Sequence, residues 1–338
     1  MPINHAIVLD NRPEAEVSTS NFKMVTAETP ALQDGEVLVK NHYLSLDPYM
    51  RGRMNAGKNY AQPQPLGEPM IGGTVGEVAE SKNAKFKVGQ TVQCMGGWQA
   101  YSLINADMPG ALKHVNAEKI SMSHYLGAVG MPGVTAWYGL NKIIQAKPSA
   151  TVTVSAASGA VGSAYGALAK ARGFRVVGIA GGQAKCDYVV NELGFDACVD
   201  YKAHTDYISL SKALRDACPN GIDGHFENVG GMVLDAVMLR ANDFSRIAVC
   251  GMIAGYNGEP LAMTNPTLIL KSRMTIEGFI VSEHMEVWPE ALAELAELIA
   301  SGKFNPRQTI AQGLAAAPEA FMGLLKGHNF GKQVVKLI

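Results

Sequence analysis

The chain has 338 residues, which suggests two domains at roughly 100–200 residues each. Hydrophobic residues make up 47% of it, so a sizeable core is possible and general disorder is excluded. Only 17% of the residues are charged and the net charge is −1, so no basic surface for nucleic acid or an anionic membrane is expected.

The spacing of the cysteines and histidines indicates which cellular compartment and which metal sites to expect. The five cysteines form no CxxC pair, and the histidines form no HExxH or HxH motif. This spacing predicts neither a disulfide framework nor a structural zinc site. The N-terminal stretch MPINHAIVLDNRPEAE holds acidic residues and no long apolar core, which is not typical of a signal peptide. We therefore expect a cytoplasmic protein.

Strand and loop patterns dominate the first 125 residues, where helical periodicity is scarce. Strand-like runs occur at 35–40, 71–78 and 87–93, and prolines and glycines cluster between 48 and 73. The chain ends on another strand-like run at 333–338.

From about residue 130, apolar runs alternate with helical stretches, which predicts a parallel, doubly wound α/β sheet. The expected strands are 152–156, 175–179, 197–200, 225–227, 246–250 and 275–281. The expected helices are 160–172, 184–193, 207–218, 232–239, 267–273 and 287–301.

The stretch 151–169 carries no charge and contains a GxxxG motif, which considered alone would suggest a membrane helix. It begins with a β-branched run, however, and then turns through Ser155–Gly159. Two short elements do not span a bilayer, so a strand, a turn and a helix are the favoured interpretation.

That turn matches A-x-G-x-x-G, a degenerate form of the dinucleotide-binding fingerprint, in the strand–turn–helix context that the fingerprint requires. Gly159 has no Cβ, so the backbone could approach a pyrophosphate, and Gly162 would let the helix pack on the strand. The helix N-terminus would offer N–H groups to the phosphates. The alternative is a plain strand–turn–helix unit.

The choice between NAD and NADP depends on the end of the second strand, where NAD sites usually carry an acidic residue. No acidic residue occurs between Thr151 and Cys186, and Lys185 stands just beyond the turn. A lysine attracts a 2′-phosphate, so the sequence favours NADP(H) as cofactor. The alternative is that Lys185 is a solvated helix residue.

Several motifs together resemble a known family. The chain is similar to zinc-free medium-chain dehydrogenases/reductases, in the leukotriene/prostaglandin reductase and curcumin reductase group. The stretches that carry the resemblance follow family order and span nearly the whole chain: Ser45–Arg51, Gly127–Trp137, Ala156–Gly162, Phe226–Gly231, Cys250–Asn257 and Gly323–Lys332.

The resemblance implies a mostly β, GroES-like catalytic domain made of residues 1–125 and 304–338. A Rossmann NADP(H)-binding domain would occupy residues 126–303, with ligands in the cleft between the domains.

The resemblance also implies the cofactor contacts. Lys185 would bind the 2′-phosphate, Tyr201 would lie near the adenosine, and Asn228 would meet the ribose. The other implied contacts are Gly159, Ala160, Val161 and Gly162 at the pyrophosphate, Cys250, Gly251, Met252 and Tyr256 along the nicotinamide half, Phe279, Ile280 and Val281 beside the nicotinamide, and Asn329 from the tail. Tyr201 and Phe279 could instead be ordinary core aromatics.

Zinc chemistry is not expected from these motifs. The zinc-containing relatives carry a Gly-His-Glu motif and a cysteine ligand, whereas residues 65–74 here contain no histidine. Oxidation of an alcohol would need such a Lewis acid. We expect instead hydride transfer from NADPH to the β-carbon of an α,β-unsaturated ketone or aldehyde, a small apolar enone.

Tyr256 is the candidate catalytic donor to the enolate oxygen, because the resembling segment lies against the nicotinamide and a phenol is protonated at neutral pH. The candidate substrate-binding residues are Tyr49, Tyr60, Arg51 and Met131. Each has a structural alternative: a turn residue for Tyr49, a surface residue for Tyr60, a salt bridge to Asp47 for Arg51 and core packing for Met131.

Two other functions stay open at this point: an NADPH quinone reductase, and an NADPH-binding sensor without turnover. The resemblance also suggests a homodimer, formed through the sheet edge at 275–281. The sequence does not specify the physiological substrate.

Overall fold

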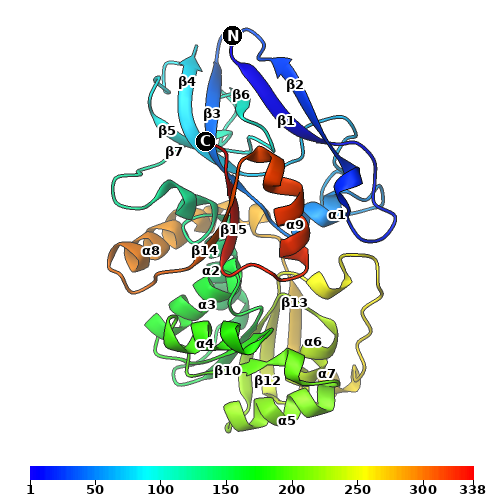
Figure 1. Cartoon of the computed structure of the whole chain (residues 1–338). Coiled ribbons are helices and arrows are strands. Elements are labelled where there is room, and N and C mark those ends of the chain that lie inside the picture. The colour runs from blue at the N-terminus through cyan, green and yellow to red at the C-terminus, as the bar shows by residue number, and fades with distance from the viewer. The chain divides into compact units, whose positions relative to one another are not determined.

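The computed structural model describes residues 1–338, which divide into two compact units. The first unit contains Met1–Leu126 and Gln308–Ile338, and the second unit contains Gly127–Arg307. Figure 1 shows the first unit in blue, cyan and red, and the second mainly in green and yellow. The expected boundaries lay after residues 125 and 303.

The second unit is built on a six-stranded sheet in the order β10-β9-β8-β11-β12-β13, in which every neighbouring pair is parallel. This is the expected Rossmann-like, doubly wound sheet. Its strands are β8 (Thr151–Ser155), β9 (Arg175–Ala180), β10 (Ala197–Asp200), β11 (Ile222–Glu227), β12 (Ala241–Val249) and β13 (Thr275–Gly278).

Helices connect consecutive strands of this sheet, as parallel pairing requires. The connecting helices are α3 (Ala160–Ala171), α4 (Gln183–Asn191), α5 (Tyr207–Ala217), α6 (Gly231–Met238) and α7 (Thr267–Lys271). Two further helices of the unit, α2 (Met131–Tyr138) and α8 (Trp288–Ala300), precede and follow the sheet in the chain. Of these, α2 was not expected from the sequence, because its glycine, proline and threonine mask the helical periodicity.

Three strands of this sheet differ from their expected bounds by three residues or more, and one of them, β11, begins at Ile222 rather than at 225. The last strand ends at Gly278, so the expected strand 275–281 is too long, and residues 281–283 form a 3₁₀ turn. Strand β12 begins five residues before the expected position 246, at Ala241. Its first half is polar, and Phe244 has a φ of 61°, so the apolar pattern that marks a buried parallel strand begins only later.

The first unit contains a two-stranded sheet and a seven-stranded sheet, and its mixed pairing suits a mostly β domain. Their strands are β1 (Ile3–Leu9), β2 (Phe22–Glu28), β3 (Glu36–Ser45), β4 (Thr74–Ser81), β5 (Thr91–Cys94), β6 (Tyr101–Asn105), β7 (Leu112–His114), β14 (Gln308–Gln312) and β15 (Lys332–Lys336). The tail belongs to this unit because β15 pairs antiparallel with β3.

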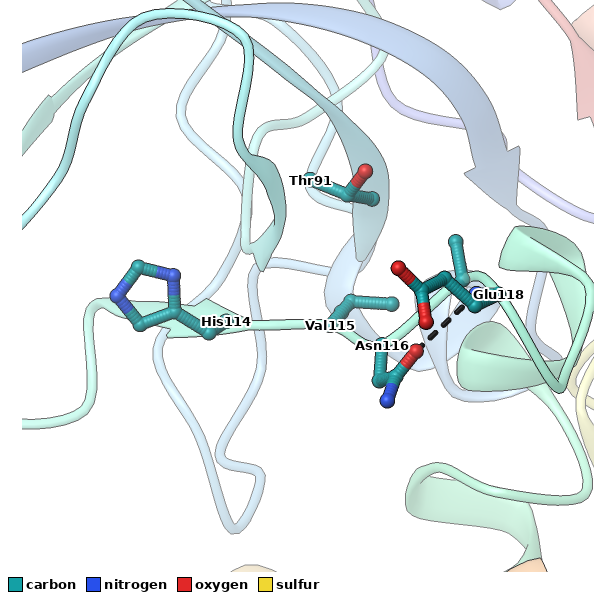
Figure 2. A pocket seen from close by; sticks show the side chains of 6 residues that line it. Thr91, His114, Val115, Asn116 and Glu118 are labelled. Atoms are coloured by element: carbon teal, nitrogen blue, oxygen red, sulfur yellow. Dashed lines mark hydrogen bonds between the residues drawn. The ribbon is translucent and has the colours of Figure 1, made fainter.

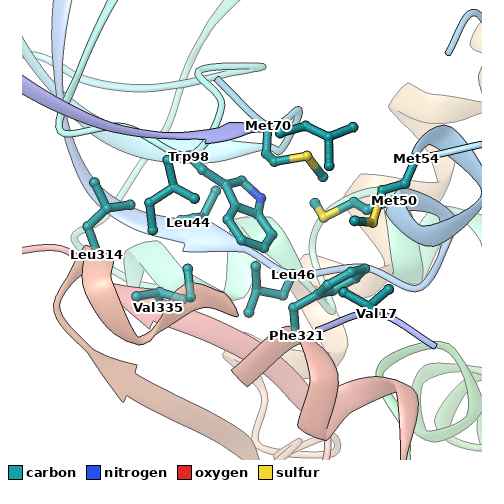
Figure 3. Packing of buried hydrophobic residues seen from close by; sticks show 13 residues of the cluster. Val17, Leu44, Leu46, Met50, Met54, Met70, Trp98, Leu314, Phe321 and Val335 are labelled. Carbon is teal, nitrogen blue, oxygen red and sulfur yellow. The ribbon is translucent and has the colours of Figure 1, made fainter. Parts of the chain in front are cut away.

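The core of the first unit joins segments from both ends of the chain. Trp98, which is fully buried, stacks on Phe22 at 5.4 Å between ring centroids and meets Phe321 edge-on at 5.7 Å. Phe321 belongs to α9 (Ala317–Leu325) and packs with Met50 of α1 (Tyr49–Arg53), as Figure 3 shows. This core therefore ties α1 to the C-terminal tail.

None of the helices combines the length and the apolar character needed to cross a bilayer. The charge-free stretch 151–169 forms β8, a turn and most of α3. A Cβ at Gly166 of its GxxxG motif would collide with the ring of Phe195, so that glycine serves packing within the second unit.

Candidate functional site

The candidate site is an edge of the six-stranded sheet. Strands β8, β9, β10, β11 and β12 are parallel, so their carboxyl ends meet at one edge, where α/β sheets bind ligands. The segments that follow these ends contain most of the residues predicted to hold the cofactor, since they include the turn before α3 as well as Tyr201, Asn228 and Cys250.

The first of these segments is the glycine turn between β8 and α3. Ala156 takes a positive φ of 49°, and Gly159 donates its N–H to the Ala156 carbonyl at 2.8 Å. A Cβ at Gly162 would lie 2.8 Å from the Cα of Ala157, so only glycine lets the helix approach the turn this closely. No side chain caps the N-terminus of α3. The turn thus has the shape and the backbone donors of a phosphate cradle.

Lysine side chains gather at the ends of β9 and β10. Lys185 lies in the first turn of α4, and its pKa is lowered by burial and by the nearby charge of Lys202. The Asp200 carboxylate accepts the backbone N–H groups of Gly182 at 2.7 Å and Lys202 at 2.9 Å, which fixes both loops. Two cations close enough to affect each other's charge suit an anion of more than one charge, such as a phosphate monoester. Sequence reasoning missed Lys202, although it directly follows Tyr201.

Tyr201 covers the turn after β9. A Cβ at Gly181 would lie 2.9 Å from its ring, so Gly181 allows this close packing. Burial and the charge of Asp200 raise the pKa of Tyr201, so its hydroxyl stays protonated.

Asn228 follows β11 and is tied to the end of β8. Its backbone N–H donates to Ser155 Oγ at 2.7 Å, and its side-chain Nδ2 donates to the Ser155 carbonyl at 2.8 Å. Its carbonyl accepts the N–H of Ile253 at 3.1 Å, so the loops after β11 and β12 are hydrogen-bonded to each other.

The segment after β12 carries Tyr256, the predicted donor. Ile253–Gly255 form a 3₁₀ turn, and a Cβ at Gly251 would lie 2.8 Å from the Tyr256 hydroxyl. Gly251 therefore makes room for that hydroxyl. Burial and the charge of Glu227 raise the pKa of Cys250 to about 12, so its thiol is neutral at physiological pH.

Residues 279–281 lie beyond β13. The Phe279 ring stacks on Tyr138 at 5.2 Å and meets Phe226 edge-on at 6.1 Å, while Val281 is buried. Phe279 therefore packs against two other aromatic rings, as expected if it is an ordinary core aromatic. Met131 opens α2 and is half-buried.

The other predicted residues belong to the first unit. Arg51 is 2% exposed, and its guanidinium donates to Asn55 Oδ1 and to the Ala15 carbonyl, both at 2.7 Å. The carboxylate of Asp47 pairs with Lys332 at 2.7 Å. Arg51 is thus engaged within its own unit.

The remaining first-unit candidates differ in burial. Burial, together with the charge of Asp47, raises the pKa of Tyr49, so its hydroxyl remains a donor. Tyr60 is 55% exposed. Asn329 is buried and donates to the Gly331 carbonyl at 2.8 Å.

A hollow on the first unit contains none of the predicted site residues. It lies at the end of β7 and is lined by Thr91, His114, Val115, Asn116, Ala117 and Glu118 (Figure 2). Asn116 Oδ1 accepts the Glu118 N–H at 3.1 Å, which closes a local turn. The hollow offers no arrangement of acid, base and nucleophile.

Two protein families match the chain. Residues 5–112 match the family described as the N-terminal domain of oxidoreductases, and residues 160–297 match the family described as zinc-binding dehydrogenases. The residues present do not fit the zinc of that description, because no group of three or more His, Cys, Asp or Glu side chains could hold a metal ion.

Similar proteins cover almost the whole chain. The NADPH-dependent curcumin reductase of Escherichia coli is 39% identical over 344 residues, 99% of this chain and 97% of that protein. The NADP⁺-dependent 2-alkenal reductase of Nicotiana tabacum is 42% identical over 334 residues, covering 98% and 95%. The crystal structure of CurA in complex with NADPH from Vibrio vulnificus has a TM-score of 0.92 and 42% identity, and covers 99% of both chains. The chain therefore belongs to the medium-chain dehydrogenase/reductase superfamily, in the group of curcumin and leukotriene/prostaglandin reductases.

Proposed function

We propose that this protein is a cytoplasmic oxidoreductase that reduces the C=C bond of α,β-unsaturated ketones and aldehydes with NADPH and without zinc. The observation that carries the proposal is the sheet edge itself, where a phosphate-cradle turn, a lysine pair and the Tyr256 segment follow neighbouring strand ends. The names of the 39% and 42% identical relatives, a curcumin reductase and an alkenal reductase, support this substrate class. The five free cysteines suit a reducing compartment.

The residues at this edge fit NADP(H). The uncapped N-terminus of α3 and the glycines at 159 and 162 would hold the pyrophosphate. Lys185, with Lys202 beside it, would bind the 2′-phosphate, and β9 ends at Ala180 rather than at a carboxylate that would repel it. Tyr201 would cover the adenosine, Asn228 the ribose, and residues 250–256 the nicotinamide half.

When bound, NADPH supplies a hydride to the β-carbon of the substrate. Negative charge then develops on the carbonyl oxygen, and a hydrogen bond from the Tyr256 hydroxyl would stabilise it there. A proton added at the α-carbon would complete the reduction of the C=C bond. Apolar side chains around the edge would exclude water, and Tyr49, Arg51, Tyr60 and Met131 are proposed to shape the substrate pocket. The proposed steps give no role to a metal ion.

The test measures NADPH and NADH oxidation by absorbance with a 4-hydroxy-2-alkenal, a curcuminoid, a quinone and an alcohol as substrates. We expect turnover of the two enones with NADPH. Turnover of the quinone alone would make the protein a quinone reductase, and tight NADPH binding without turnover would make it a sensor.

Replacing Tyr256 by Phe tests the proposed donor. Loss of one hydrogen bond to the developing enolate should lower kcat by about 10- to 100-fold and leave the KM for NADPH nearly unchanged. Tyr165→Phe is the matched control, since the Tyr165 hydroxyl is buried in the core without a hydrogen-bond partner. A normal kcat in Tyr256→Phe would show that the Tyr256 hydroxyl does not stabilise the developing enolate.

We also propose a homodimer that pairs through the sheet edge at β13. This strand is paired on one side only, with β12, and exposed strand edges readily pair with a second chain. Leu270 is 80% exposed and Phe244 is 68% exposed beside this end of the sheet. Light scattering of the purified protein should give twice the mass of one chain, and Thr275→Pro should return it to one.

A further inference from the structure

A buried carboxylate that the reaction does not use lies at the centre of the candidate site. Glu227 is the last residue of β11, and it and His225 are 0% exposed. A buried charge is costly unless every lone pair finds a donor. The arrangement around Glu227 provides those donors.

Both oxygens of the Glu227 carboxylate are satisfied. Oε1 accepts the Ser155 hydroxyl at 2.6 Å and the N–H groups of Val229 at 2.5 Å and Gly230 at 3.0 Å. Oε2 lies 3.0 Å from Nε2 of His225, whose Nδ1 lies 2.7 Å from Thr153 Oγ1. One oxygen therefore gathers three donors from two strand ends.

Glu227 is ionised in this setting. Burial by itself would raise the pKa of Glu227, but the hydrogen bonds from His225, Ser155 and the Val229 N–H, with the charge of His225, outweigh burial and lower it. An ionised carboxylate can only accept hydrogen bonds, which matches the donors around it.

The same residue connects three of the segments proposed to hold NADPH. Through Ser155 it reaches the end of β8, and through Val229 and Gly230 it shapes the loop that contains Asn228. Its own backbone carbonyl accepts the N–H of Cys250 at 3.0 Å, at the start of the Tyr256 segment.

We propose that Glu227 is a positioning residue, whose carboxylate holds Asn228 and the segment after β12 in the geometry that binds the nicotinamide half of NADPH. This inference rests on the proposed function for the identity of the ligand. It predicts that Glu227 affects one half of the cofactor and not the other. Lys185 lies on α4, after β9, and Tyr201 follows β10, whereas the Glu227 carboxylate bonds to residues of β8 and β11 and of the loop after β11.

The experiment measures by calorimetry the Kd of two ligands that contain different parts of the cofactor. Adenosine 2′,5′-bisphosphate probes the adenosine half alone, and NADPH probes both halves. Glu227→Gln keeps the shape, turns the three charge-assisted hydrogen bonds at Oε1 into neutral ones, and places an amide N–H where Oε2 meets His225. We expect its Kd for NADPH to rise about tenfold, while its Kd for the bisphosphate stays within about twofold of the wild-type value.

Asp223→Asn is the matched control. Asp223 lies on the same strand, at the opposite end, and its carboxylate accepts the Thr151 N–H of β8 at 2.9 Å and the Asn242 side chain at 2.8 Å. This variant loses a similar cross-strand contact far from the carboxyl edge. We expect both Glu227→Gln and Asp223→Asn to have a lower Tm than the wild type. Asp223→Asn should bind NADPH and the bisphosphate with unchanged affinity, whereas Glu227→Gln should bind NADPH more weakly.

If Glu227→Gln does not fold, Ser155→Ala decides the matter, because it removes a donor to Oε1 and the acceptor of the Asn228 N–H. It should raise the Kd for NADPH about threefold and leave the bisphosphate unaffected. Equal changes for both ligands, or none, in the variant that folds would overturn the inference. A wild-type protein that binds NADPH no more tightly than the bisphosphate would instead contradict the proposed site for the nicotinamide half.

Discussion

The two units present their candidate residues in different ways. In the second unit, the candidates follow the ends of neighbouring parallel strands, so the topology of the sheet places them along one edge. In the first unit, they lie on a short helix, a loop and the tail, each held by particular side-chain contacts such as that between Lys332 and Asp47. The candidates of the second unit thus share one framework of strand ends, whereas those of the first unit depend on separate local contacts.

The largest expected effect comes from the ion pair of the first unit. Lys332 donates to Asp47 Oδ1 at 2.7 Å and to the Leu46 carbonyl at 2.6 Å, and both side chains of the ion pair are less than 10% exposed. Removal of one partner leaves a buried charge, so Lys332→Met should lower the free energy of unfolding by about 3–5 kcal/mol in urea titrations.

The control is Lys326→Met, since Lys326 forms an exposed ion pair with Glu16 at 3.1 Å. That pair should contribute less than about 1 kcal/mol. Equal losses in the two variants would show that the buried contact does not hold the tail on the first unit.

The second-largest effect is expected from a glycine substitution at the strand ends of the second unit, compared with one in the first unit. An alanine at Gly162 would push against the backbone of Ala157, whereas an alanine at Gly57 meets nothing within 4 Å. We expect Gly162→Ala to lower stability by about 2 kcal/mol and to weaken NADPH binding, measured by thermal unfolding with and without NADPH. Gly57→Ala should change neither the stability nor the affinity for NADPH. A similar response in both variants would show that the close approach at Gly162 has no special role.

The lysine pair should give a smaller effect, confined to one cofactor. If Lys185 binds the 2′-phosphate as proposed, Lys185→Ala should raise the KM for NADPH about tenfold, while the KM for NADH stays the same. Lys202→Ala should act in the same direction and less strongly. Lys170→Ala, which breaks an ion pair with Asp196 at 3.0 Å, is the control within the same unit. Equal loss with both coenzymes would rule out the 2′-phosphate as the partner of Lys185.

The smallest expected effect is a pH dependence of stability. The folded-state pKa of Glu227 lies below its ordinary value of 4.5, so its ionised form stabilises the fold above that pH. This contribution should be lost as the pH falls below 4.5 through the folded-state pKa. The difference in unfolding free energy between wild type and Glu227→Gln should be about 1 kcal/mol at neutral pH and shrink on acidification. A difference that stays constant between pH 7 and pH 4 would show that the charge of Glu227 contributes nothing.

The second unit could be predicted from the sequence better than the first. Buried parallel strands form continuous runs without charge, and β8, in which every residue is buried, lies within one residue of its expected bounds. The glycine turn was also readable, because close packing at Gly162 tolerates only one residue type. Helix α2 and the first half of β12 were missed because their polar, glycine and proline residues hide the periodicity.

Burial and pairing across the chain were not predictable. Arg51 could equally have paired with Asp47, but the aspartate is 2.7 Å from Lys332, which is 285 residues away in the sequence. Glu227 was not recognised because an acidic residue at a strand end looks the same in the sequence whether it is solvated or buried.

The sequence by itself determined the alternation of strands and helices, the turn at 156–162 and the family, since these depend on local spacing and residue type. Only the tertiary structure decided that Lys202 lies close to Lys185, that Glu227 joins three loops, and that the tail completes the first sheet. Those facts depend on which strands become neighbours. Local sequence does not encode strand neighbours, because the pairing free energy comes from contacts between distant residues.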